Sequence, residues 1–165
     1  MSADADYTRV LNDFIGHLHA ARCSQAIWLR VYNDDRYQVA AKYGLQIAFD
    51  VIALTLRKFE DFYEHDLHKA IPAKANRPAD AKWLLQESKR RHLRTAANTL
   101  IAHYKSQETG KVPTESEISH LIAKGGWQTE HELMEWVGSV IERLERVRDA
   151  IKTHDTIDPR GPKGK

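Results

Sequence analysis

Residues 43–56 have the sequence YGLQIAFDVIALTL, in which apolar side chains fall on most sides of a helix. A helix that is apolar all round must form the buried centre of a bundle or the floor of an interface. We expect this helix to run from about Asp35 to Ala70. Ile71-Pro72 ends it, because proline lacks an amide hydrogen and disfavours a helical residue before it. Beyond Arg57 the helix becomes polar.

The rest of the chain also has the helical period, and strand-like alternation is absent. Four further helices are expected. The first covers about residues 6–31, and the third helix of the chain is capped by Asp80 and ends near Tyr104. A short helix follows from Thr114 to Gly125-Gly126, and Thr129 caps the last helix. The expected core face of the first consists of Val10, Leu11, Phe14, Leu18, Ala21, Ile27, Trp28 and Val31. The last helix has a narrow seam for packing along another helix, formed by Leu133, Val137, Val140, Leu144, Val147 and Ile151. The sequence therefore predicts an all-α, up-and-down bundle of four long helices and one short helix.

Length and composition describe an ordinary globular protein, with 165 residues, 42% hydrophobic and 29% charged. We expect one domain over residues 1–157 and a disordered basic tail over residues 158–165, which are rich in proline, glycine and lysine. No apolar run reaches the roughly 18 residues of a membrane span, so no membrane contact is expected. The single cysteine, Cys23, is expected to be buried; it cannot form an internal disulfide, which is typical of cytoplasmic proteins.

Positive charge is concentrated on the third helix, although the net charge of the chain is only +2. The basic side chains are followed by an amide and an imidazole, Asn98 and His103. Cutting RNA without a metal needs a group that transfers protons near neutral pH, which histidine supplies, and a fixed cation that stabilises the phosphorane. Both ingredients lie on this helix. The candidates for RNA binding are Lys89, Arg90, Arg91, His92 and Lys105.

The run Asn98-Thr99-Leu100-Ile101-Ala102-His103 resembles the Arg-Asn-x-x-Ile-Ala-His form of the motif in the HEPN superfamily, small helical bundles of prokaryotic toxin, abortive-infection and CRISPR systems. Residues 53–61, ALTLRKFED, resemble its abortive-infection-U branch. The resemblance implies a homodimer whose two motifs face each other and form one metal-independent ribonuclease site. It implies RNA as substrate, a cognate antitoxin as a further partner, and no cofactor or metal.

The chain departs from that motif at one position, because the family arginine would fall at Ala97. Arg94 lies one turn earlier, about 180° from His103 on an ideal helix. Two hypotheses follow. In the first, the protein is a ribonuclease in which His103 is the acid and base, Asn98 orients it or the phosphate, and Arg94 with Arg91 offers charge. In the second, it is a catalytically inactive HEPN bundle that binds RNA or protein. A third possibility is an accessory bundle whose basic helix is only a soluble surface.

Two other patterns in the sequence suggest a metal site and a DNA-binding motif. His65 and His68, three residues apart with Glu64 nearby, have a spacing that suits a metal, but a solvated helix end is favoured because no second copy of the motif exists. Residues 112–118 with Gly125-Gly126 resemble a helix-turn-helix. The next helix begins with acidic residues, which disfavour entry into the major groove of DNA.

Overall fold

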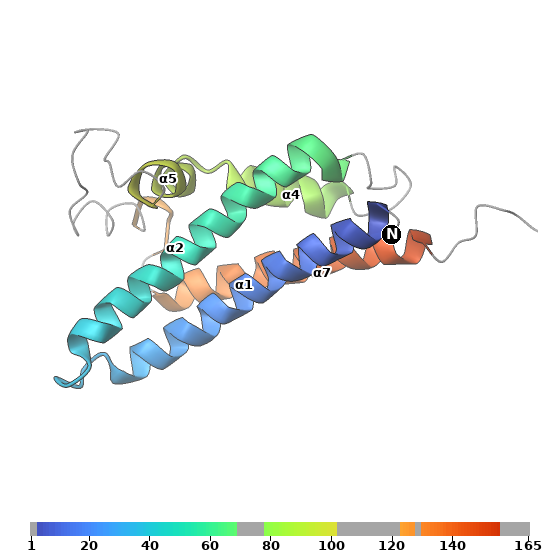
Figure 1. Ribbon diagram of the computed structural model, residues 1–165. Helices are drawn as coiled ribbons and strands as arrows, with labels where there is room; N and C mark the ends of the chain where they lie inside the picture. Colours follow the sequence, from blue (N-terminus) through green and yellow to red (C-terminus); the bar gives the residue numbers. More distant parts are fainter. Residues whose placement is uncertain (1–2, 69–77, 102–122, 128–129, 156–165) are drawn as a thin grey trace, which may run out of the picture.

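The computed structural model describes residues 3–68, 78–101, 123–127 and 130–155, and every regular element within these ranges is helical (Figure 1). In chain order the elements are α1 (Ala3–Val31), α2 (Gln38–Phe62), the π-helix η1 (Tyr63–Leu67), α4 (Pro78–Ser88), α5 (Arg91–Thr95), the π-helix η2 (Ala96–Ile101) and α7 (Glu130–Asp155). The predicted all-α class is confirmed. The first, second and last long helices lie where the sequence predicts them.

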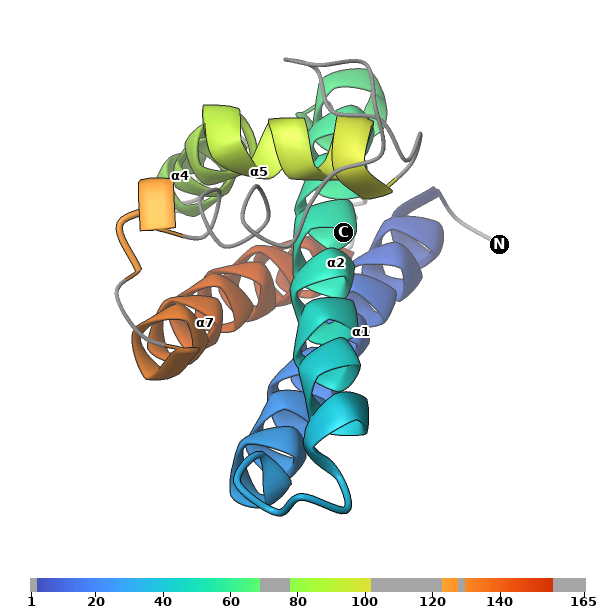
Figure 2. The ribbon, with the colours of Figure 1, turned by 90° about the vertical axis from the view of Figure 1, so that its left-hand side faces the viewer.

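Helices α1 and α2 form an antiparallel hairpin whose turn end projects beyond α7 (Figures 1 and 2). The helices approach closely at Gly44, where an added Cβ would overlap the indole ring of Trp28. Within the hairpin the predicted core face of α1 is confirmed for Leu11, Phe14, Leu18 and Ala21. The predicted burial of Ile27 is wrong. Ile27 is exposed because it lies in the projecting end, where α7 does not cover α1.

Helix α7 packs against α1 and α4, and all six residues of its predicted seam are buried. Asp80 accepts hydrogen bonds from Arg143 and Arg146 of α7, and the guanidinium of Arg143 lies 4.1 Å from the centre of the Trp83 ring. The cap predicted at Asp80 is wrong, because α4 already begins at Pro78 and Asp80 lies inside its first turn. Its carboxylate therefore ties two helices together.

The single third helix predicted from Asp80 to Tyr104 is also wrong within the described residues. Helix α4 ends at Ser88, the backbone is extended at Arg90 (φ −54°, ψ 127°), and α5 begins at Arg91. No glycine or proline causes this break. The side chain of Arg90 instead makes tertiary contacts at the break, described below. Since η2 then has π geometry, faces assigned at 100° per residue do not apply beyond Thr95.

Helix α2 is only partly covered, although residues 43–56 are apolar on most sides. Ala48, Phe49, Ile52, Ala53 and Leu56 are buried, whereas Val39, Tyr43 and Ile47 are 70%, 61% and 60% exposed. The stretch Gln38–Leu67 is long and apolar enough to cross a membrane by length and composition alone, a test that the core helix of a globular protein also passes, and 44% of its most apolar window is buried in the protein. Cys23 is exposed, so its predicted burial is wrong.

Several predicted features lie outside the described residues. They are the cap at Thr129, the tail from Asp158, and the short helix from Thr114 except for its last residues. There Gly126 has a positive φ of 85° and its amide donates to the Ala123 carbonyl, as expected at a helix end.

Candidate functional site

The polar end of α2 carries the acidic half of the candidate site. Glu60 lies among the buried side chains of α2 and is 0% exposed. Arg57, one turn earlier, places its Nη1 3.1 Å from Glu60 Oε2 and 2.9 Å from Asp61 Oδ1. A buried carboxylate is costly unless it is paired with a cation. Glu60 therefore needs its arginine partners. Asp61 is half-exposed, so water weakens its interaction with Arg57.

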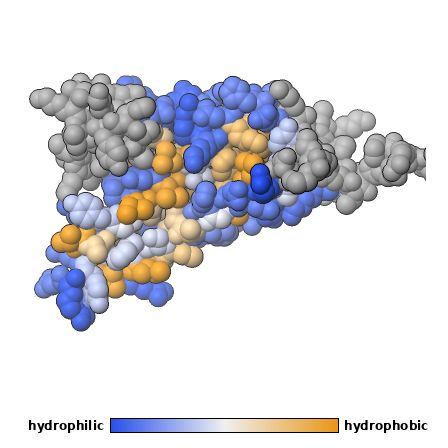
Figure 3. Space-filling model, in the orientation of Figure 1, coloured by the Kyte–Doolittle hydropathy of each residue, from blue (hydrophilic) through white to orange (hydrophobic). Residues whose placement is uncertain are grey.

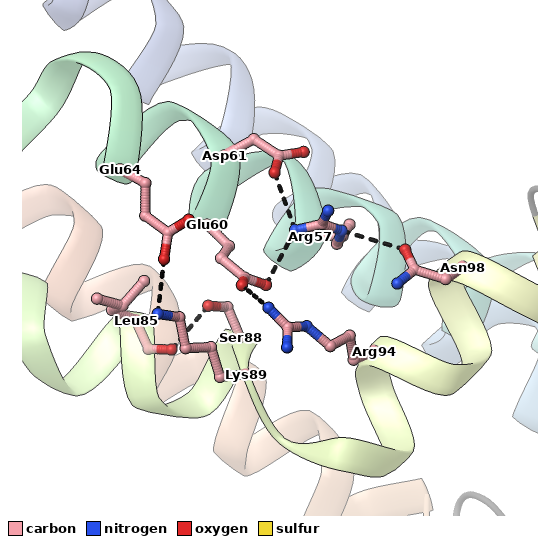
Figure 4. A network of polar contacts seen from close by, with 9 residues as sticks. All are labelled: Arg57, Glu60, Asp61, Glu64, Leu85, Ser88, Lys89, Arg94 and Asn98. Atoms are coloured by element: carbon pink, nitrogen blue, oxygen red, sulfur yellow. Dashed lines mark hydrogen bonds and ion pairs between the residues drawn. The ribbon is translucent and has the colours of Figure 1, made fainter.

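The other half comes from α5 and η2, which pack against α2. Arg94 of α5 donates from Nη2 to Glu60 Oε1, and Arg57 donates from Nε to Asn98 Oδ1 of η2 at 3.1 Å (Figure 4). One buried carboxylate thus pairs with two guanidinium groups from different elements. Asn98 and Arg94, both predicted site residues, are brought together around Glu60 and Arg57.

The two π-helices of the described chain lie on either side of this network. The π-helix η1 continues α2 directly after the acidic residues, and η2 contains Asn98. π-Helical turns make up well under 1% of residues in globular proteins and often occur at functional sites. The geometry of η2 gives the motif segment a twist that an ideal α-helix does not have.

The basic run from Lys89 to Arg94, which covers the break after α4 and most of α5, is mostly neutralised by carboxylates that the sequence does not place beside it. Lys89 Nζ lies 2.6 Å from Glu64 Oε1 of η1, and Arg94 pairs with Glu60 of α2, so these two pairs link the run to η1 and α2 (Figure 4). Bonding to Lys89 lowers the pKa of the Glu64 carboxyl. Arg91 is exposed, and no carboxylate of the described residues pairs with it. It is the only free cation that the described part of the run offers.

Arg90 and His92 lie in a separate aromatic cluster. Arg90 pairs with Glu87 at 2.7 Å, and its guanidinium lies 5.8 and 5.7 Å from the ring centres of Trp127 and Trp136. His92 packs edge-on against Trp127, and its Nε2 is buried without a hydrogen-bond partner among the described residues. Burial, followed by the charge of Arg90, lowers the pKa of His92 to about 4. At neutral pH His92 is therefore uncharged.

Three positions of the predicted motif region contribute no described side chain to this network. His103 and Lys105 lie outside the described residues. Ala97, where the family arginine would fall, is buried in the core. Sequence reasoning missed Arg57, Glu60 and Asp61 as site residues. A signal was present, because Glu60 falls in helical register with the core positions Ala53, Leu56 and Leu67, where a charged side chain needs a partner.

Within the described part of the chain, no three or more histidine, cysteine, aspartate or glutamate side chains form a group able to hold a metal ion. His65 and His68 are exposed, and His68 Nδ1 lies 3.0 Å from the Tyr63 carbonyl oxygen. The network around Glu60 instead presents arginine and amide donors, which suit an anion such as a phosphodiester.

Comparison with known protein families, with curated proteins and with solved structures gives no match to this chain.

Proposed function

We propose that this protein is a metal-independent endoribonuclease of the HEPN type, a cytoplasmic toxin or phage-defence protein that acts as a homodimer. His103 is the acid and base, Asn98 orients it or the phosphate, and Arg94 supplies charge. The proposal includes the four-helix, up-and-down order of an HEPN bundle. It also includes a cognate antitoxin as a partner.

The observation that carries the proposal is the Asn98 side chain, which is held by a hydrogen bond from Arg57 within a π-helix, five residues before His103. A fixed amide beside guanidinium groups can donate hydrogen bonds to a phosphodiester in a defined position.

An apolar stripe on α2 supports the homodimer. Val39, Tyr43 and Ile47 are spaced four residues apart and therefore lie on one side of the helix. Leu54 and Asp61 follow Ile47 at steps of seven residues, which is close to two turns, so the same side leads to the Arg57 network. Hydrophobic side chains gather on the surface over the α1–α2 hairpin (Figure 3). A two-fold contact between copies on this stripe would cover it and bring the two networks toward each other.

The second candidate function is an inactive HEPN bundle that binds RNA or protein. The observation that favours it is the buried alanine at position 97, together with the ion pair that Arg94 already makes with Glu60. In this case the polar network would hold the fold together and contact a ligand without cleaving it.

Incubation of total RNA with the purified protein in EDTA, beside a His103→Ala variant, separates the two functions. Cleavage that survives EDTA and is lost in the variant is the expected result, because the chemistry needs a proton-transfer group and no metal. A well-folded dimer that leaves RNA intact would contradict the ribonuclease and favour the binding module. Cleavage that persists in His103→Ala would point to a contaminating nuclease.

A further inference from the structure

The hydrogen bond between Arg57 and Asn98 determines which way the Asn98 amide faces. Because Oδ1 accepts from Arg57 Nε, the two N–H donors on Nδ2 have no acceptor among the described residues and remain for another partner (Figure 4). Arg57 is also incompletely used. Its Nε and Nη1 are engaged, but no residue in the described ranges accepts from Nη2. The Arg57 guanidinium and the Asn98 amide, which are bonded to each other, therefore both keep donors without a partner in the described ranges, and the Arg57 side chain is 30% exposed.

The charges around Arg57 leave it able to bind an anion. Arg57 and Arg94 carry two positive charges and share a single buried carboxylate, Glu60. Two other carboxylates lie near this pair: Asp61, which is 52% exposed and is screened by water, and Glu64, which pairs with Lys89. Glu60 thus acts as a positioning residue that holds two guanidinium groups without cancelling both charges. Asp61 behaves as a weak, replaceable partner of Arg57.

We propose that Arg57 of α2, with the Asn98 amide, binds the phosphodiester of RNA and supplies from another helix the cation that Ala97 cannot provide. This inference deepens the proposed function and rests on RNA being its ligand. A phosphate that binds the Arg57 guanidinium would replace the Asp61 carboxylate. It would accept hydrogen bonds from the guanidinium and from the Asn98 amide. The planar guanidinium offers paired donors, which lysine does not.

The test measures RNA binding, so that it does not depend on cleavage. The probe is a short, fluorescein-labelled, single-stranded RNA of mixed sequence, titrated in EDTA at several salt concentrations by fluorescence anisotropy. All proteins carry His103→Ala, which keeps the RNA intact. Arg57→Gln, Arg57→Lys and Asp61→Asn are compared with Arg36→Gln, because Arg36 is also an arginine paired with an aspartate but lies in the α1–α2 turn.

Arg57→Gln is expected to weaken binding about tenfold and to reduce the slope of log Kd against log salt by about 0.7, the value for one phosphate contact to a single strand. Arg57→Lys keeps the charge and is expected to keep the slope while losing affinity. Asp61→Asn removes the competitor of the phosphate and is expected to tighten binding. Arg36→Gln is expected to match the parent protein.

Equal slopes and affinities for Arg57→Gln and Arg36→Gln would overturn the inference. If Arg57→Gln fails to fold, Asp61→Asn decides: unchanged or weaker binding means that Arg57 only holds the fold. A parent protein that does not bind RNA overturns the inference together with the proposed function. If binding depends on Arg57 but the wild-type chain does not cleave RNA, the inference stands and the ribonuclease is rejected. If the chain cleaves RNA and Arg57→Gln does not affect cleavage, the ribonuclease stands and the inference is rejected.

Discussion

At the scale of single residues, His92 makes the stability of the protein depend on pH. Its pKa is lowered to about 4 in the folded protein, from an ordinary value of 6.5, chiefly by burial. Between these two values the unfolded chain binds a proton that the folded chain does not, so stability is complete above pH 6.5 and is lost as the pH falls toward 4. Lowering the pH from 7.5 to 5 should cost about 2 kcal/mol in the free energy of unfolding from this residue.

Urea unfolding at the two pH values measures this effect, with His92→Phe as the comparison. Phenylalanine keeps a ring against Trp127 and removes the buried Nε2 that has no partner among the described residues. The variant should therefore lose about 2 kcal/mol less than the wild type over the same pH interval. An identical loss in both proteins would show that His92 is not the titrating group.

At the scale of elements, the α1–α2 hairpin depends on the absence of a side chain at Gly44. A methyl group there would overlap the Trp28 ring, so Gly44→Ala should force the helices apart or push the ring into solvent. Overpacking of this kind typically costs about 1–3 kcal/mol. Gly16 in α1 is the matched control, because an added Cβ meets nothing within 4 Å there and alanine should stabilise the helix by about 0.5–1 kcal/mol.

Thermal unfolding of the two glycine variants separates the tertiary effect from helix propensity. Gly44→Ala should melt below the wild type and Gly16→Ala above it. If both substitutions raise the melting temperature, the close approach of α1 and α2 at Gly44 does not exist in solution.

At the scale of the whole molecule, the apolar stripe on α2 predicts self-association. Replacing Tyr43 and Ile47 together by glutamate would place like charges across a two-fold contact, and the protein should become a monomer with lost ribonuclease activity. Light scattering after gel filtration measures the mass. Tyr37→Glu is the control, because Tyr37 is an exposed tyrosine that precedes α2 and lies off the stripe. A wild-type monomer at micromolar concentration would contradict the homodimer.

The sequence by itself determined the features that depend on neighbours along the chain. Helical class, the positions of α1, α2 and α7, and the buried seam of α7 all follow from periodicity, because side chains three and four residues apart share a face. The helix end expected at Ile71-Pro72 lies outside the described residues.

Only the tertiary structure decided the break at Arg90 and the composition of the candidate site. The contacts responsible join residues far apart in sequence: 34 residues separate Glu60 from Arg94, and 41 separate Arg57 from Asn98. A basic run is a patch of free charge in the sequence but a set of ion pairs in the fold. No local pattern states which buried carboxylate a distant arginine will meet, because that pairing follows from how the helices pack and from the cost of burying a lone charge.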